Sequence, residues 1–218
     1  MSAEIVVFGR IPAPGRVKTR LASAVGDSAA AEVYRLLLDH VLAEACATGP
    51  AVTLALAAAP RPGDAWRAPA GVEVEFQEAG DLGQRMLRAF ERRFRSGAAC
   101  AVLVGSDLPG LSAALLHQAF LALERVPVVL GPSADGGYWL VGQRRPGHDL
   151  FTGVPWSSPE VLHATRLRLL ELKVAHDELP TLRDIDTLSD LEALVADTEL
   201  DETLRRHLGK LVRNRTGM

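Results

Sequence analysis

The chain has 218 residues, a formal net charge of −3 and 48% hydrophobic residues. A chain of this length can bury the core of one large α/β domain, and its charge excludes the global basic field of proteins that bind nucleic acid or anionic membranes non-specifically. Cys46 and Cys100 occur in apolar segments without CxxC spacing, so we expect reduced core residues rather than a disulfide or a metal site. We find no signal segment and no apolar stretch of about 18 residues, which predicts a cytoplasmic protein without a membrane span.

Apolar runs bounded by turn residues alternate with helical patterns, which is typical of crossover βα units and a mainly parallel sheet. Strands are predicted at residues 5–8, 52–56, 72–76, 101–104, 128–130, 138–141 and 172–176. Helices are predicted at residues 28–47, 82–95, 112–124, 161–170 and 188–196. We therefore expect a single domain over residues 1–218, with its core at 5–196 and a helical tail at 197–218 that frays from residue 208 onward.

Residues that accept hydrogen bonds from free backbone N–H groups stand at the expected helix starts. Asp27 or Ser28 is the expected N-cap of the first helix, and Ser112 is the expected cap of the third. Ser158, followed by proline and glutamate, is the expected cap of the fourth.

A basic loop at residues 10–20 follows the first predicted strand. Its four cations are Arg10, Arg16, Lys18 and Arg20. Two prolines and Gly15 hold its backbone in an irregular path, and directly after a strand such a backbone and a lysine can cradle phosphate oxygens. A solvated basic turn is the alternative. The GxxxxGK[ST] spacing is absent, so this is not a Walker loop.

A carboxylate loop at residues 105–110 follows the fourth predicted strand. Asp107 precedes Leu108 and Pro109, which fix the chain and leave the carboxylate at the rim of the sheet. A hard divalent cation that is bound together with phosphate needs one or two carboxylates in such a place. The alternative is a turn or capping aspartate ahead of Ser112.

A third loop, at residues 131–137, ends in Asp135, Gly136 and Gly137. Its two glycines allow a backbone to approach a ligand closely, and we predict that the three residues contact an acceptor. Asp-Gly is also a favoured hairpin pair, so a turn into the next strand explains the same residues.

Two further segments are candidates for contact with small molecules. Residues 77–85 join a strand to an amphipathic helix through glycines, including Gly83, and are predicted to meet a base or ribose; a helix start capped by Asp81 is the alternative. Trp156 and Ser157 are predicted to line an acceptor pocket, and an aromatic side chain in a packed loop is the alternative.

Asp184 and Asp186 precede the helix that is predicted at 188–196. In an extended segment, carboxylates at i and i+2 point the same way, which makes this pair a candidate second metal arm. Alternatively, one of the aspartates or Thr187 caps the helix.

Six segments together carry a resemblance that covers residue 5 to about residue 196. They are FGRIPAPGRVKTRL at 8–21, QEAGDLGQRM at 77–86, GSDLPGL at 105–111, GPSADGGYWLVG at 131–142, GVPWSS at 153–158 and RDIDTLSDL at 183–191. This ordered set resembles a bacterial group of GT-A-fold, glycosyltransferase-like proteins in the nucleotide-diphospho-sugar transferase superfamily. The group is similar to the 2-phospho-lactate and molybdenum cofactor guanylyltransferases.

The resemblance implies a Rossmann-like GT-A fold, with a mainly parallel mixed sheet that is flanked by helices, and a nucleotide bound by the N-terminal half. It also implies Mg²⁺ (or Mn²⁺) held by Asp107, with Asp186 at a second metal position. The residues that it places on the phosphates are Arg10, Gly15, Lys18 and Arg20, and it places Gly83 near the nucleoside. The first loop lacks the GxGTRM-like run of sugar nucleotidyltransferases, and the carboxylate loop reads SDLP rather than DxD.

We therefore predict a Mg²⁺-dependent transferase that uses an NTP or nucleotide-sugar donor and a small-molecule acceptor, with Lys18 and Asp107 as catalytic residues. Nucleotidyl transfer and glycosyl transfer both remain open. The six histidines show no ligand spacing and there is no GxSxG elbow, so a hydrolase is not favoured. The alternative from another class is a non-catalytic nucleotide-binding or regulatory module on the same fold.

Overall fold

The computed structural model describes residues 2–197 and 202–216. Its elements in chain order are β1 (Ala3–Gly9), α1 (Thr19–Val25), α2 (Asp27–Ala47), β2 (Ala51–Leu56), β3 (Glu73–Phe76), α3 (Leu82–Arg95), β4 (Cys100–Gly105), α4 (Ala113–Arg125), β5 (Val128–Pro132), β6 (Tyr138–Arg144), α5 (Val161–Glu171), β7 (His176–Glu178), α6 (Leu188–Ala196) and α7 (Glu202–Thr216). None of the helices among these residues is both long enough and apolar enough to cross a bilayer.

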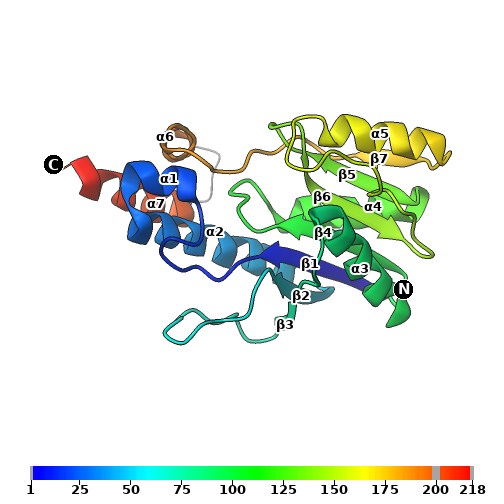
Figure 1. Ribbon diagram of the computed structural model, residues 1–218, viewed down its shortest axis with the longest axis horizontal. Coiled ribbons are helices and arrows are strands. Elements are labelled where there is room, and N and C mark those ends of the chain that lie inside the picture. The colour runs from blue at the N-terminus through cyan, green and yellow to red at the C-terminus, as the bar shows by residue number, and fades with distance from the viewer. Residues whose placement is uncertain (1, 198–201, 217–218) are drawn as a thin grey trace.

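A seven-stranded sheet forms the centre of the domain, in the order β3-β2-β1-β4-β6-β5-β7 (Figure 1). β1 pairs in parallel with β2 and β4, and the two edge strands are also parallel to their neighbours. In contrast, β6 is antiparallel to both β4 and β5. The predicted α/β fold with a mainly parallel mixed sheet is confirmed.

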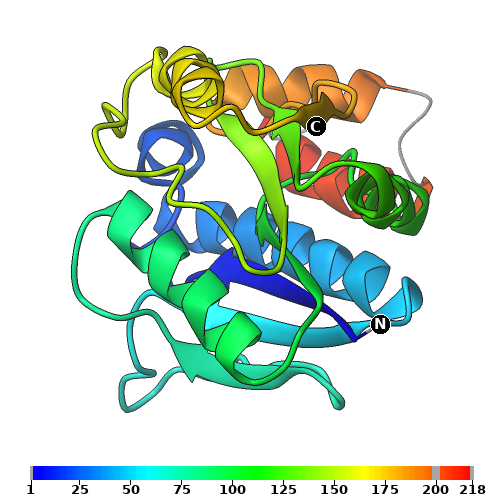
Figure 2. The ribbon, with the colours of Figure 1, turned by 90° about the vertical axis from the view of Figure 1, so that its right-hand side faces the viewer.

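Helices cover both faces of the sheet (Figure 2). Side chains that alternate along β1 enter different apolar clusters, because successive residues of a strand point to opposite faces. Ile5 and Val7 pack in one cluster with α2 and α4, whereas Val6 packs in another with α3 and α5. The sheet is therefore buried on both faces, as its continuous apolar strands indicate.

A third apolar cluster joins α1, α6 and α7 to the outer side of α2. It includes Leu21 of α1, Leu37 of α2 and Leu208 of α7, none of which is exposed to solvent. Figure 1 shows these helices beyond the carboxyl ends of the parallel strands. The cluster thus fixes the segment that leads into α6 beside the rim of the sheet where the polar loops lie.

Two elements differ from the sequence prediction. Helix α1 begins at Thr19, inside the segment predicted as a loop, because Leu21 is fully buried and Gly26 ends this short helix at a φ of 84°. The last strand is β7 (His176–Glu178), not residues 172–176, because α5 extends to Glu171 and closes through Lys173 at a φ of 55°.

Four smaller predictions were also wrong. Cys46 lies on the exposed side of α2 rather than in the core. Gly26 stands at the N-cap position of α2, where Asp27 or Ser28 was expected. Ser158 does not cap α5, because its hydroxyl accepts from the Glu160 N–H and donates to the Pro155 carbonyl within a turn. The tail that was predicted to fray from residue 208 belongs to α7 as far as Thr216, and residues 217–218 lie outside the described residues.

Candidate functional site

A pocket of about 530 Å³, called the first pocket below, opens at the carboxyl ends of β1 and β4. Its walls are Phe8, Gly9, Arg10, Val17, Lys18, Thr19, Arg20, Tyr34, Ala57, Gln77, Leu82, Arg85, Gly105, Ser106, Asp107, Ser157 and Asp186. Strand ends in open α/β sheets are the usual place for ligands. The basic loop, the carboxylate loop and the segment before α6 meet here, although they are far apart in the sequence.

Lys18 lies at the centre of this pocket. Its Nζ atom donates to Asp107 Oδ2 at 2.5 Å and to Asp186 Oδ1 at 2.9 Å, and only 4% of its side chain is exposed. Burial lowers the pKa of the ammonium, but the charges and hydrogen bonds of the two aspartates outweigh burial and raise the pKa above its usual value. Lys18 is therefore protonated at neutral pH and is held against two carboxylates.

The backbone of Lys18 is also unusual. It has a φ of 47° and a ψ of 47°, a left-handed conformation that non-glycine residues seldom adopt, and it immediately precedes α1. The conformation directs the chain from the basic loop into the helix. Such strain is retained when surrounding contacts fix it, and the two aspartate bonds supply those contacts.

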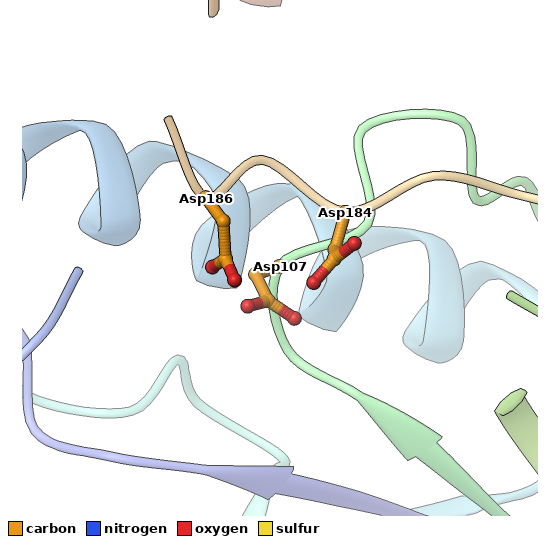
Figure 3. A group of neighbouring side chains, drawn as sticks. All are labelled: Asp107, Asp184 and Asp186. Atoms are coloured by element: carbon orange, nitrogen blue, oxygen red, sulfur yellow. The ribbon is translucent and has the colours of Figure 1, made fainter. Parts of the chain in front are cut away.

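Three carboxylates, two of which accept hydrogen bonds from Lys18, lie close together (Figure 3). Asp107, Asp184 and Asp186 each offer an oxygen, and these three oxygens lie within 4.8 Å of one another. Burial, followed by the charges of Asp107 and Asp186, raises the pKa of Asp184. An all-oxygen group with repulsion among its members fits a hard divalent cation, because the cation would relieve that repulsion.

The turn that precedes α6 caps this helix through Thr187 and not through Asp186. Thr187 caps the helix, since its hydroxyl accepts from the Asp190 N–H, and the Asp190 carboxylate accepts in return from the Thr187 N–H at 2.7 Å. Ile185 is buried, so Asp184 and Asp186 on either side of it point toward Asp107. Capping therefore does not occupy Asp186, and the predicted i, i+2 alignment is observed.

Asp107 likewise does not cap the helix that follows it. Ser112 caps α4, since its side chain accepts from the Leu115 N–H, which leaves the Asp107 carboxylate for Lys18. The turn itself is held by Leu108, which is buried.

Sequence reasoning missed a hydrogen-bonded bridge between the basic loop and the carboxylate loop. The Tyr34 hydroxyl of α2 lies 2.8 Å from Ser106 Oγ and accepts from the Arg10 N–H at 2.8 Å. Burial is the largest cause of the raised pKa of Tyr34, so the phenol stays neutral. A tyrosine in the middle of a helix looks like a core residue in the sequence, and no local signal indicates its polar role.

Only some of the residues that were predicted to bind phosphate line the first pocket. Arg10 and Arg20 line the first pocket with Lys18, and the Arg20 guanidinium lies 3.5 Å from Asp186. Gly15 has a φ of 72° but is not part of the lining, and Arg16 turns away to form an ion pair with Asp64.

The segment predicted to meet a nucleoside forms one side of the first pocket. Asp81 caps α3 in a reciprocal capping box with Gln84, which is the alternative that the sequence left open. Gln77 and Arg85 line the pocket, and Arg85 Nη1 donates to Gln77 Oε1 at 3.0 Å. Sequence reasoning named Gly83 but gave neither of these side chains a role.

Gly83 itself is buried behind the lining. A Cβ atom at this position would lie 2.5 Å from Trp156 Nε1, so glycine lets the indole pack directly on the start of α3. Trp156 also contacts Tyr138 edge-on, with ring centroids 6.3 Å apart. Of the residues predicted to meet an acceptor, Ser157 is in the lining, with a φ of 64°, and Trp156 lies behind it.

Asp135, Gly136 and Gly137 form the hairpin between β5 and β6. The Asp135 carboxylate accepts from the Gly137 N–H at 2.9 Å, and the Ser133 N–H donates to the Gly137 carbonyl at 2.9 Å. The three residues line neither the first pocket nor the second pocket described next.

The second pocket has a volume of about 600 Å³ and lies on the other side of Asp184. Its walls are His40, Glu44, Pro109, Gly110, Leu111, Ser112, Thr181, Leu182, Arg183, Asp184, Ile185, Asp190, Ala193, Leu194 and Asp197. Asp107 and Asp186 face the first pocket whereas Asp184 faces the second, so the three carboxylates form a wall between the two.

A family model described as "Uncharacterized protein conserved in bacteria (DUF2064)" matches residues 40–158, which is more than half of the chain. The crystal structure of a candidate nucleotide-diphospho-sugar transferase from Desulfovibrio desulfuricans G20 is 30% identical, with a TM-score of 0.89, and the match covers 100% of this chain and 96% of that one. No curated protein matches the chain.

More distant structures share the fold. Rv0371c of Mycobacterium tuberculosis H37Rv, in complex with manganese, is 20% identical with a TM-score of 0.52, covering 91% of this chain and 100% of that one. A cytidylyltransferase from Leptospira borgpetersenii is 17% identical with a TM-score of 0.54, covering 100% and 96%. The fold is that of the nucleotide-diphospho-sugar transferases.

Proposed function

Because this chain belongs to the bacterial DUF2064 family, we propose that it is a transferase that binds an NTP or nucleotide-sugar donor together with Mg²⁺ or Mn²⁺. It passes a nucleotidyl or glycosyl group to a small-molecule acceptor. One observation carries the proposal. Lys18, Asp107 and Asp186 meet in a pocket at the strand ends, where a cation and a carboxylate pair can together bind a metal-bound phosphate.

The phosphates occupy the basic side of the first pocket in this proposal. Arg10, Lys18 and Arg20 provide charge-assisted hydrogen bonds to phosphate oxygens, and Gly15 shapes the loop that presents them. The base and ribose lie toward Gln77 and Arg85, on the surface that Gly83 and Trp156 support from behind.

Asp107 and Asp186 hold the divalent cation, with Asp184 as a third oxygen donor. When bound, such an ion neutralises phosphate charge and acts as a Lewis acid. Lys18 and Asp107 are the catalytic residues: the lysine stabilises negative charge on the leaving phosphate, and the aspartate would position the phosphate through the cation that it holds. The manganese in the similar Mycobacterium tuberculosis structure supports this choice of ion.

The acceptor residues that the sequence predicts remain part of the proposal. Ser157 stands at the rim of the first pocket, and Trp156 supports it. Asp135, Gly136 and Gly137 would need to reach the acceptor from their hairpin.

A thermal-shift panel of NTPs and nucleotide sugars, each with and without Mg²⁺ or Mn²⁺, tests donor binding, because a selective ligand raises the melting temperature by mass action. We expect one donor class to stabilise the protein, and only when the metal is present. If no nucleotide stabilises the protein under either condition, the proposal fails. If a nucleotide binds but no acceptor in a broad panel releases pyrophosphate or nucleoside diphosphate, the non-catalytic module is the better description.

A further inference from the structure

The carboxylate wall separates two pockets of opposite charge. The first pocket has four cationic side chains, Arg10, Lys18, Arg20 and Arg85, against the carboxylates of Asp107 and Asp186. The described lining of the second pocket has the carboxylates of Glu44, Asp184, Asp190 and Asp197 against one guanidinium, that of Arg183. The two sides of one wall therefore favour ligands of different charge.

The acidic side chains of the second pocket are fixed by backbone groups. Glu44 Oε2 accepts from the Ala113 N–H at 2.7 Å, at the start of α4, and Asp190 Oδ2 accepts from Thr187 at the start of α6. These bonds hold the two carboxylates in place. Leu111 and Leu194 also line the pocket and provide a buried apolar surface. Fixed acceptors beside an apolar floor are typical of small-molecule sites.

We propose that the second pocket binds the acceptor, and that this acceptor is a neutral or cationic hydroxyl or amine compound rather than a phosphate ester. The proposal rests on the proposed function, since it takes the first pocket as the donor site, and it places the acceptor in the second pocket instead of at Ser157 and the β5–β6 hairpin. A phosphate dianion there would meet the carboxylates of the lining, whose like charge would repel it. Hydroxyl and ammonium groups would instead donate hydrogen bonds to those carboxylates.

The two pockets adjoin at this wall. An oxygen of Asp184 lies within 4.8 Å of oxygens of both Asp107 and Asp186, so a group against Asp184 is close to a donor against Asp107. The acceptor oxygen or nitrogen forms the new bond to the transferred group, and its proton leaves to solvent. The bond from that group to the leaving phosphate breaks, and pyrophosphate or nucleoside diphosphate departs with the electron pair.

Two substitutions in α6 test the site. Ala193 is exposed and lines the second pocket, so Ala193→Phe fills it, whereas Ala196→Phe adds the same ring to the same helix outside the lining. The probes are two matched pairs: glucosamine with glucosamine 6-phosphate, and ethanolamine with O-phosphoethanolamine. Binding to the full chain is measured by saturation-transfer NMR, and nucleotide binding is measured in parallel by calorimetry.

We expect at least one unphosphorylated probe to bind the unmodified protein, and Ala193→Phe to weaken it about tenfold or more, which corresponds to about 1.4 kcal/mol. Ala196→Phe should not change it, and both variants should bind nucleotide normally. The inference is overturned if neither unphosphorylated probe binds or if Ala193→Phe leaves the binding of these probes unchanged. It is also overturned if Ala193→Phe weakens the binding of a phosphate ester. Should nucleotide fail to bind the unmodified protein, the proposed function itself falls.

Discussion

The loop after β1 and the loop after β5 were both predicted to contact a ligand, yet of these two only the loop after β1 lines the first or the second pocket. Each follows a buried strand and combines charge with glycine. The first crosses to α1 and presents Arg10, Lys18 and Arg20 at the strand ends. The second turns back as a hairpin, and the carbonyl of its Gly136 accepts from the Leu162 N–H at 2.9 Å.

Strand direction explains this difference. A parallel strand must leave the sheet at its carboxyl end, so the polar groups of the following loop have no ladder partner and are available for a ligand. An antiparallel partner instead takes the chain straight back, and the hairpin satisfies its own groups. The loop after β4, a strand parallel to β1, accordingly delivers Asp107 to the first pocket.

The largest effect should come from Asp107→Asn. The substitution keeps the size of the side chain but removes the charge that a divalent cation requires, so Mg²⁺-dependent nucleotide binding should be lost while the fold is retained. Calorimetry with and without Mg²⁺ measures this change. Unaltered magnesium dependence would show that Asp107 does not bind the metal. The loop after β4 would then, like the β5–β6 hairpin, have no metal-binding role.

Asp186→Ser should also abolish metal-dependent turnover, because a neutral hydroxyl is a poor replacement for a carboxylate at Mg²⁺. Its melting temperature should change little, since Thr187 caps α6. Thr187→Ala is the matched control: it should cost about 1 kcal/mol of stability and preserve turnover. A fully active Asp186→Ser enzyme would contradict the metal assignment.

Lys18→Ala should weaken triphosphate binding much more than nucleoside binding. Each lost charge-assisted hydrogen bond to phosphate costs about 1.5 to 3 kcal/mol. Comparing the two ligands by calorimetry separates a phosphate contact from a loop-holding role, because equal losses would show that the lysine only fixes the loop.

Gly136→Ala tests the other loop and should act on stability rather than on nucleotide binding. Its φ is 89°, and a Cβ atom would lie 2.1 Å from the Pro159 carbonyl oxygen, so we expect a loss of about 1 to 3 kcal/mol in the free energy of unfolding. Denaturant melts give this value. Nucleotide binding should be unchanged at a temperature where the variant is folded, and a selective loss of binding would assign the hairpin a role at the site.

Local patterns were sufficient to predict most of the sheet and its helices. Five strands, β1, β2, β4, β5 and β6, are short apolar runs that are largely buried. Helices α3 and α6 begin and end at the predicted residues, and Asp81 and Thr187 are strong caps at their starts. Helix α1 was missed because it has seven residues and follows a left-handed lysine, neither of which leaves a periodic signal.

The site could be predicted only as separate loops. Asp107 and Asp186 could be named from strand-end position and i, i+2 spacing, but their meeting at Lys18 depends on how α6 packs against α1 and α2. Tyr34 could not be found, since its hydroxyl reaches Ser106 across 72 positions in the sequence. Gly83 was named for a ligand, whereas the structure shows it in contact with Trp156.

The link between Lys18 and Asp186 spans 168 positions in the sequence. During synthesis the basic loop, β1 and β4 leave the ribosome well before the segment that carries Asp184 and Asp186. Closing such a long loop costs conformational entropy, which the packing of α6 against α1 and α2 offsets. A nascent chain therefore cannot bring its three carboxylates together until the segment that carries Asp184 and Asp186 has been made.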